Sequence, residues 1–196
     1  MKEKNGVYLS AYPMMALTLI FASILLIGFM QKILFLLILG GVGVLFVAPG
    51  FFVVKPNDAA GLVLLGKYHG SVRESGFHWA LPLYQKVKTT LRLHNLTTEK
   101  IKVNDQKGNP IEISAVVVWK VDDTAKALFG VDQVNSFVEI QSESAIRQLA
   151  TLYPYDNHDA RGQKTLRENV NEVNKSLSNQ LKERFEKAGV EVIEAR

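Results

Sequence analysis

Two long apolar runs dominate the first quarter of the chain. They cover Met14–Met30 and Ile33–Val54, and the only polar residues between them are Gln31 and Lys32. A helix needs about 20 apolar residues to cross ~30 Å of hydrocarbon. The pattern therefore predicts a transmembrane helical hairpin, with a tight turn between the two helices.

The expected helices cover about 12–30 and 33–48. Pro49 and Gly50 end the second helix, because proline lacks the backbone donor that a helix requires. The next four residues would then lie extended at the membrane interface, and we expect them to contact the bilayer: Phe51, Phe52, Val53 and Val54. A cleaved signal peptide is disfavoured, because a second apolar run follows the first at once.

Basic residues near the hairpin predict its orientation. Lys2 and Lys4 precede the first helix, Lys55 and Lys67 follow the second, and the turn carries only Lys32. The positive-inside rule then places both ends, and the domain that follows, in the cytoplasm. We expect a cell-membrane protein with two spans, although a hairpin that enters one leaflet and returns would leave the domain on the same side.

Beyond Lys55 the polarity pattern predicts strands first and helices afterwards. The expected strands cover 59–66, 85–93, 97–103, 111–121 and 190–195, with 97–103 next to 85–93. Asp122 and Asp123 favour the start of a short helix, which Gly130 ends. This order indicates an α+β domain with helices on one side of an antiparallel sheet.

Two longer helices follow, and each begins at a predicted capping box, in which a hydroxyl and a glutamate satisfy free amides. The boxes are Ser136–Glu139 and Thr165–Glu168. Each helix carries one apolar stripe. The members of the first stripe are Val138, Ala145, Leu149 and Leu152, and those of the second are Leu166, Val170, Val173, Leu177, Leu181 and Phe185.

Charge and composition exclude several classes of function. Three of the 23 basic and one of the 19 acidic residues precede Lys55, which leaves 20 against 18 from Lys55 onward. This near-neutral domain does not indicate a nucleic-acid surface, which needs clustered basic residues. The chain has no cysteine, which excludes disulfides, thiolate zinc sites and a cysteine nucleophile.

Few residues suggest chemistry. Asp156, His158 and Asp159 lie close together in a polar stretch that we interpret as a solvated loop, and Ser142 and Ser144 lack the strand–turn–helix context of a nucleophile. We expect no catalytic, metal or cofactor site. A membrane hydrolase that uses Asp156, His158 or Ser144 is the least favoured hypothesis.

One strand face is basic, with Lys86, Lys88 and Arg92 at alternate positions. Three interpretations remain open. The face is solvated, it contacts anionic lipid headgroups, or it pairs with acidic residues of a neighbouring subunit.

Several blocks resemble the SPFH family, also called Band 7, which includes stomatins, prohibitins and flotillins. They are the segments 55–59, 65–68, 70–76, 102–105, 108–113, 141–145, 153–156 and 189–196, together with Trp119. The resemblance covers roughly Phe51 to Arg196. It implies two small α+β subdomains, which we expect at 55–96 and 97–196 after a membrane anchor over 1–54.

The resemblance also implies a function. Family members are non-enzymatic scaffolds that assemble into large rings or cages, enclose a membrane patch and organise lipids and partner proteins such as membrane proteases. We therefore expect a homo-oligomeric scaffold of a membrane microdomain. The alternative is a docking subunit of a membrane protease or transporter that forms no ring. The family normally continues into a coiled coil, so we expect this sequence to be a fragment.

Overall fold

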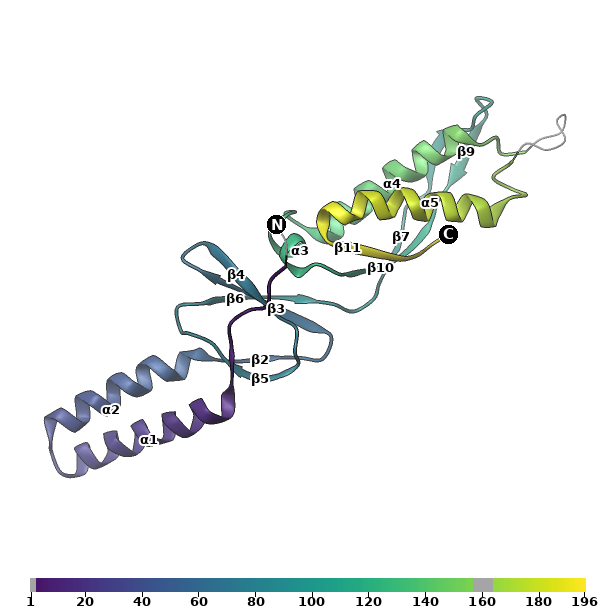
Figure 1. The fold of residues 1–196 in the computed structure, drawn as a ribbon. Helices are drawn as coiled ribbons and strands as arrows, with labels where there is room; N and C mark the ends of the chain where they lie inside the picture. Colours follow the sequence, from purple (N-terminus) through teal and green to yellow (C-terminus); the bar gives the residue numbers. More distant parts are fainter. Residues whose placement is uncertain (1–2, 157–163) are drawn as a thin grey trace. The chain divides into compact units, whose positions relative to one another are not determined.

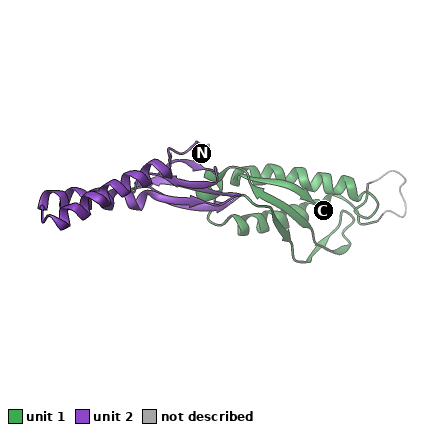
Figure 2. Cartoon of the chain, turned by 90° about the horizontal axis from the view of Figure 1, so that it is seen from below, with its two compact units in different colours: residues 1–2, 91–196 green, residues 3–90 purple. Residues whose placement is uncertain are grey.

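The computed structural model describes residues 3–156 and 164–196, and they form two compact units. The N-terminal unit covers Glu3–Thr90 and the C-terminal unit covers Leu91–Arg196 (Figure 2). The subdomain boundary expected after Leu96 differs from this division. The reason is that β7 (His94–Thr97) pairs with β10 (Val116–Val121), a strand of the C-terminal unit.

Two apolar helices open the N-terminal unit (Figure 1). They are α1 (Ala11–Met30) and α2 (Leu34–Val47), and the short 3-10 helix η1 (Ala48–Gly50) extends the second. The helices pack closely where Gly40 faces the backbone of Leu25, because a Cβ at Gly40 would lie 2.5 Å from the Leu25 nitrogen.

Only one helix in the described part of the chain is long and apolar enough to cross a membrane, and it is α1 with Gln31. Its 20 residues reach about 30 Å, whereas the 14 residues of α2 reach about 21 Å. The structure therefore shows one N-terminal apolar helix of spanning length, and the expectation of two spans is not confirmed.

Six strands complete the N-terminal unit as two antiparallel sheets. β1 (Leu9–Ser10), β5 (Gly76–Trp79) and β2 (Phe51–Val54) form one sheet in that order. β4 (Lys67–Val72), β3 (Asp58–Leu64) and β6 (Gln85–Thr90) form the other. Their buried side chains make one apolar core, which consists of Phe52, Val54, Ala60, Leu62, Val72 and Ala80.

The C-terminal unit places two long helices against a three-stranded antiparallel sheet. Its strands are β7, β8 (Ile101–Asn104), β9 (Pro110–Ile113), β10 and β11 (Val190–Ala195). Its helices are α3 (Thr124–Phe129), α4 (Val134–Leu152), α5 (Val170–Phe185) and the short η2 (Glu186–Ala188). The sheet order is β11–β10–β7, and β8 pairs only with β9 among the described strands.

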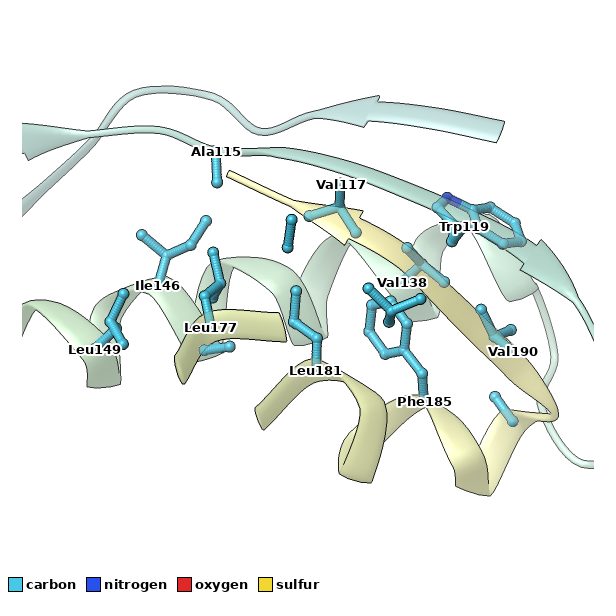
Figure 3. Close-up of a cluster of buried hydrophobic side chains, with 14 of the residues drawn as sticks. Ala115, Val117, Trp119, Val138, Ile146, Leu149, Leu177, Leu181, Phe185 and Val190 are labelled. Atoms are coloured by element: carbon cyan, nitrogen blue, oxygen red, sulfur yellow. The ribbon is translucent and has the colours of Figure 1, made fainter. Parts of the chain in front are cut away.

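The core of this unit lies between the helices and the sheet (Figure 3). Val117 and Trp119 of β10 face Ile146 of α4 and Leu181 and Phe185 of α5, and all five side chains are buried. The stripe predicted for α5 is confirmed over 173–185, while Val170 is half exposed. The outcome for α4 is similar, because its predicted stripe is buried except for Leu152.

Three predicted strand and pairing features are wrong. The stretch 111–121 contains two strands, β9 and β10, rather than one. The stretch 97–103 is not one strand and does not pair with β6, because β6 pairs with β3 and β8 pairs with β9. Each error concerns pairing, which depends on contacts between segments that are distant in the sequence.

The helix boundaries test the predicted caps. Asp123 caps α3 as predicted, because its carboxylate accepts a hydrogen bond from the Lys126 amide at 3.0 Å. The box at Ser136 is wrong, since α4 begins two residues earlier, at Val134. The Thr165 hydroxyl does accept from the Glu168 amide at 3.0 Å, but in a turn that precedes α5.

Candidate membrane-contact site

Two of the four residues expected to contact the bilayer are buried inside the protein. Phe52 and Val54 point from β2 into the apolar core of the N-terminal unit and are 7% and 2% exposed. Successive residues of a strand point to opposite faces, so β2 can present only alternate side chains outward. The interfacial prediction for Phe52 and Val54 is therefore wrong.

The outward face of β2 carries the other two residues. Phe51 lies opposite Trp79 and Val53 lies opposite Phe77 on the neighbouring strand β5. The Phe51 and Phe77 rings are stacked, with centroids 5.3 Å apart, and Val53 is half exposed. These side chains form an apolar outer surface on the sheet, and bilayer contact by Phe51 and Val53 stays a prediction.

The end of α2 is joined to the sheet by hydrogen bonds and close packing. The Trp79 indole Nε1 donates to the Val47 carbonyl at 2.8 Å, and the Ala80 amide donates to the Gly50 carbonyl at 3.0 Å. A Cβ at Gly50 would lie 2.2 Å from Trp79 Nε1, so only glycine fits under the indole. The buried tryptophan thus fixes the start of β2 relative to the end of α2.

Lys86 belongs to the same junction. Its ammonium donates to the carbonyl oxygens of Pro49 at 2.9 Å and Gly50 at 3.3 Å. It also lies 5.4 Å from the centre of the Phe52 ring. Burial lowers the pKa of Lys86, because desolvation disfavours the charged form. A cation at the end of a helix stabilises its unpaired carbonyls, so Lys86 acts as a cap at the C-terminal end of α2 and η1.

The three basic residues predicted to share one face do not all lie on the strand. Lys88 follows Lys86 on the same face of β6 and is exposed, opposite Ala60. Arg92 lies beyond the end of β6, in the C-terminal unit. Headgroup or subunit contact by these residues stays a prediction, and Lys88 and Arg92 are the two that are exposed.

The segment before α1 is part of the same β-structure. The Gly6 amide donates to the Ser71 carbonyl at 2.9 Å, and the Ser71 amide donates to the Lys4 carbonyl at 2.8 Å. Leu9 then pairs with Trp79 in the β1–β5 ladder. Sequence reasoning missed this segment, here called the strap (residues 4–10), because so short a segment carries no clear strand pattern.

Side chains hold this strap as well. The Tyr8 hydroxyl donates to the Glu74 carboxylate at 2.7 Å, and this hydrogen bond raises the pKa of Tyr8. Gly70 has a φ of +141°, and a Cβ there would lie 2.6 Å from the Gly6 Cα. The two glycines therefore allow the backbones of the strap and β4 to cross in contact.

In the C-terminal unit, Asp105 organises the β8–β9 turn. Its carboxylate accepts from the amides of Tyr155 at 3.0 Å, Lys107 at 2.9 Å and Asn109 at 2.7 Å. These donors, the Tyr155 amide first, lower the pKa of Asp105 to about 2. The contact with Tyr155 could not be predicted from local sequence, since it joins residues far apart in the chain.

The residues considered for chemistry have structural partners. Ser142 is buried, and its hydroxyl donates to the Val138 carbonyl at 2.7 Å, while the Ser144 hydroxyl accepts from Arg184 at 3.0 Å. Asp156 pairs with Arg167 at 2.9 Å. His158 and Asp159 lie outside the described residues. Within residues 3–156 and 164–196, no three His, Asp or Glu side chains gather as metal ligands.

Comparison with known proteins covers most of the chain. A family model described as SPFH domain / Band 7 family matches residues 52–196, from the second residue of β2 to the C-terminal residue. A search of the curated proteins finds no match. The matched segment begins directly after the junction of α2 with the sheet.

Proposed function

The chain belongs to the SPFH domain / Band 7 family, and on that premise we propose that it is a non-enzymatic membrane scaffold. In this role it oligomerises laterally and organises a membrane microdomain with its resident proteins. The proposal has two parts, which are the anchor and the assembly. The anchor is supported by the structure of the N-terminal unit, and the assembly by membership of the family, whose proteins are typically membrane scaffolds.

The surface of α1 supports the anchor. The helix carries no charged residue, and large side chains such as Leu19, Phe29 and Met30 are 63%, 73% and 75% exposed. A helix that is apolar on all sides belongs in a protein core or a bilayer, and only a small part of α1 is buried in this chain. A bilayer is the environment that satisfies such a surface.

The hydrogen bonds of the strap before α1 support a hairpin topology for the two helices. Residues 4–10 hydrogen-bond to β4 and β5, and β2 follows α2 directly into the same sheet. Residues on both flanks of the two helices therefore belong to one β-structure. A β-structure outside the bilayer lies on one side of it, so α1 and α2 form a hairpin whose ends lie on the same face.

The length of α2 determines whether the second helix can span the bilayer. With the three residues of η1 it reaches about 27 Å, counting ~1.5 Å per helical residue and ~2 Å per 3-10 residue. This is slightly less than the ~30 Å of hydrocarbon, and a bilayer thins locally around a short segment. We propose two spans with both ends in the cytoplasm, the side favoured by Lys4, Lys55 and Lys67.

The hydrogen bonds of the serines support a non-enzymatic role. Ser142 and Ser144 are engaged with a backbone carbonyl and with an arginine, and neither bonds to a base that would activate a nucleophile. Asp156 serves an ion pair with Arg167. These side chains therefore have structural roles: the two serines form hydrogen bonds of α4, and Asp156 forms an ion pair with Arg167.

The experiment that tests the scaffold is the native mass of the protein extracted from its membrane in mild detergent, with negative-stain images of the same fraction. We expect particles of megadalton order with ring or cage outlines. A monomer or a small complex in several detergents would contradict lateral assembly. It would favour instead a docking subunit bound to one membrane protease or transporter.

A further inference from the structure

A leucine occupies the tip of the β3–β4 hairpin in a conformation that leucine rarely adopts. Leu65 and Gly66 are the two turn residues between the paired Leu64 and Lys67, and their φ angles are +48° and +79°. Such turns strongly favour Asn-Gly or Gly-Gly, because both residues need positive φ. Leu65 is also 91% exposed, so no packing in the chain compensates the strain.

Exposure and strain together indicate a role outside the chain. A non-glycine residue with positive φ persists only where something else requires it, and such residues are frequent at functional sites. Asparagine would serve the turn better, and a polar residue would suit water better. Leucine satisfies neither requirement, but it suits an apolar environment at the hairpin tip.

The pairing of the strands shows which end of the sheet this tip occupies. Leu62 lies opposite Lys86 on β6, and the Lys86 ammonium binds the carbonyls of Pro49 and Gly50 at the end of α2. Leu65 is three residues further along the chain, about 10 Å in the strand direction. The tip therefore lies at the end of the sheet that adjoins α2 (Figure 1).

A second loop at the same end also exposes leucines. The Ala80 amide is bonded to the Gly50 carbonyl, and the next residues form the turn Leu81–Tyr84, closed by a hydrogen bond from the Tyr84 amide to the Leu81 carbonyl. Leu81 and Leu83 in this turn are 42% and 69% exposed. Two separate turns thus present leucines next to the end of the apolar helix.

We propose that Leu65, Leu81 and Leu83, here called the leucine collar, insert into the bilayer surface around the base of the helical hairpin. Interfacial segments bury their apolar side chains ~5–10 Å into the headgroup and acyl boundary. The collar matches this depth because it lies beside the end of α2, and Lys67 directly follows the β3–β4 tip and would face lipid phosphates. The inference rests on the proposed membrane anchor.

The experiment uses the complete chain, which lacks cysteine. Single cysteines replace Leu65, Asn57 or Leu19. The purified variants are labelled with an environment-sensitive nitrobenzoxadiazole dye and reconstituted in liposomes of equimolar phosphatidylcholine and phosphatidylglycerol. Asn57 is the matched control, because it is exposed, has a φ of +60° and lies in the turn at the opposite end of β3. Leu19 reports on the anchor, because it lies in the middle of α1 and is 63% exposed on the helix surface.

We expect lipid-borne doxyl groups to quench the dye at position 65 several-fold more than at position 57, and aqueous iodide to show the reverse order. Iodide quenching at position 65, with lipid quenching at position 19, would overturn the collar and leave the anchor intact. Protection of position 65 from both quenchers would also overturn it, because a protein surface would then cover the leucine. Iodide quenching at position 19 would refute the anchor itself.

A second variant separates insertion from folding. Leu65→Asn suits the positive φ of the turn, so the hairpin should retain its fold and its amides should exchange more slowly with deuterium. The same change should reduce the lipid quenching of a dye at position 83 several-fold. Leu65→Met, which keeps an apolar side chain at this position, should leave that quenching unchanged. Unchanged quenching at position 83 in the asparagine variant would show that Leu65 does not hold this end of the sheet in the bilayer.

Discussion

The carboxylate of Asp105 illustrates how one side chain joins elements that are distant in the sequence. It accepts four hydrogen bonds, from the amides of Lys107, Asn109 and Tyr155 and from the Asn109 side chain at 3.1 Å. Three of these bonds close the β8–β9 turn, and the fourth attaches the turn to the segment after α4. A carboxylate that accepts several backbone bonds is held in its charged form.

The lowered pKa of Asp105 predicts how the stability of the fold depends on pH. The folded state lowers the pKa of Asp105 from 3.8 to about 2, so its contribution is complete above the ordinary value and is lost as pH falls through about 2. Thermal unfolding, followed by circular dichroism in detergent, should show a falling midpoint across that interval. Asp105→Asn should lower the midpoint at neutral pH and flatten the acid dependence, whereas parallel profiles for both proteins would contradict the assignment.

We expect the same substitution to have different effects at the two lysines of β6. Lys86→Met keeps the aliphatic stem but removes the donor to Pro49 and Gly50, which should destabilise the protein by on the order of 1 kcal/mol. Lys88→Met is the matched control, because Lys88 is exposed on the same face of the strand. Chemical denaturation of both variants measures the difference, and equal effects would mean that the Lys86 cap does not stabilise the junction.

At the scale of elements, the packing of α1 against α2 depends on glycine. A Cβ at Gly40 would lie 2.5 Å from the Leu25 backbone nitrogen, whereas one at Gly41 would lie 3.8 Å from the Leu25 side chain, an ordinary contact. Small residues let membrane helices approach closely. The two adjacent glycines therefore differ in what they tolerate.

This difference predicts a matched pair of variants. Gly40→Ala forces the helices apart and should cost about 1–3 kcal/mol, as overpacking does, while Gly41→Ala should have little effect. The measurement is the temperature at which each purified variant aggregates in mild detergent. If both variants aggregate at the temperature of the unchanged protein, the contact between the helices does not contribute to stability.

At the scale of the whole molecule, the hairpin predicts which residues share a compartment. A single cysteine at Lys107 in the β8–β9 turn, or at Asn5 in the strap, should react with an impermeant thiol reagent only after intact cells are permeabilised. A cysteine at Gln31 in the turn between α1 and α2 should react from outside. Labelling of position 107 in intact cells would contradict the cytoplasmic assignment, and different sidedness of positions 5 and 107 would contradict the hairpin.

The sequence by itself determined the features that depend on neighbouring residues. The apolar run that forms α1, the buried stripe of α5, the Asp123 cap and the strand after Gly189 were all predicted, and they are present in the structure. Each follows from a period or a cap within a few residues. The family resemblance, carried by several short blocks, was confirmed over residues 52–196.

Only the tertiary structure decided which residues meet across long separations. It buried Phe52 and Val54, bound Lys86 to the end of α2, paired residues before α1 with β4 and β5, and divided 111–121 between two strands. A strand pattern indicates two faces but not which face is covered, because coverage depends on the partner segment. The site at the base of the hairpin is built from such contacts, so its residues could not be assigned from local pattern alone.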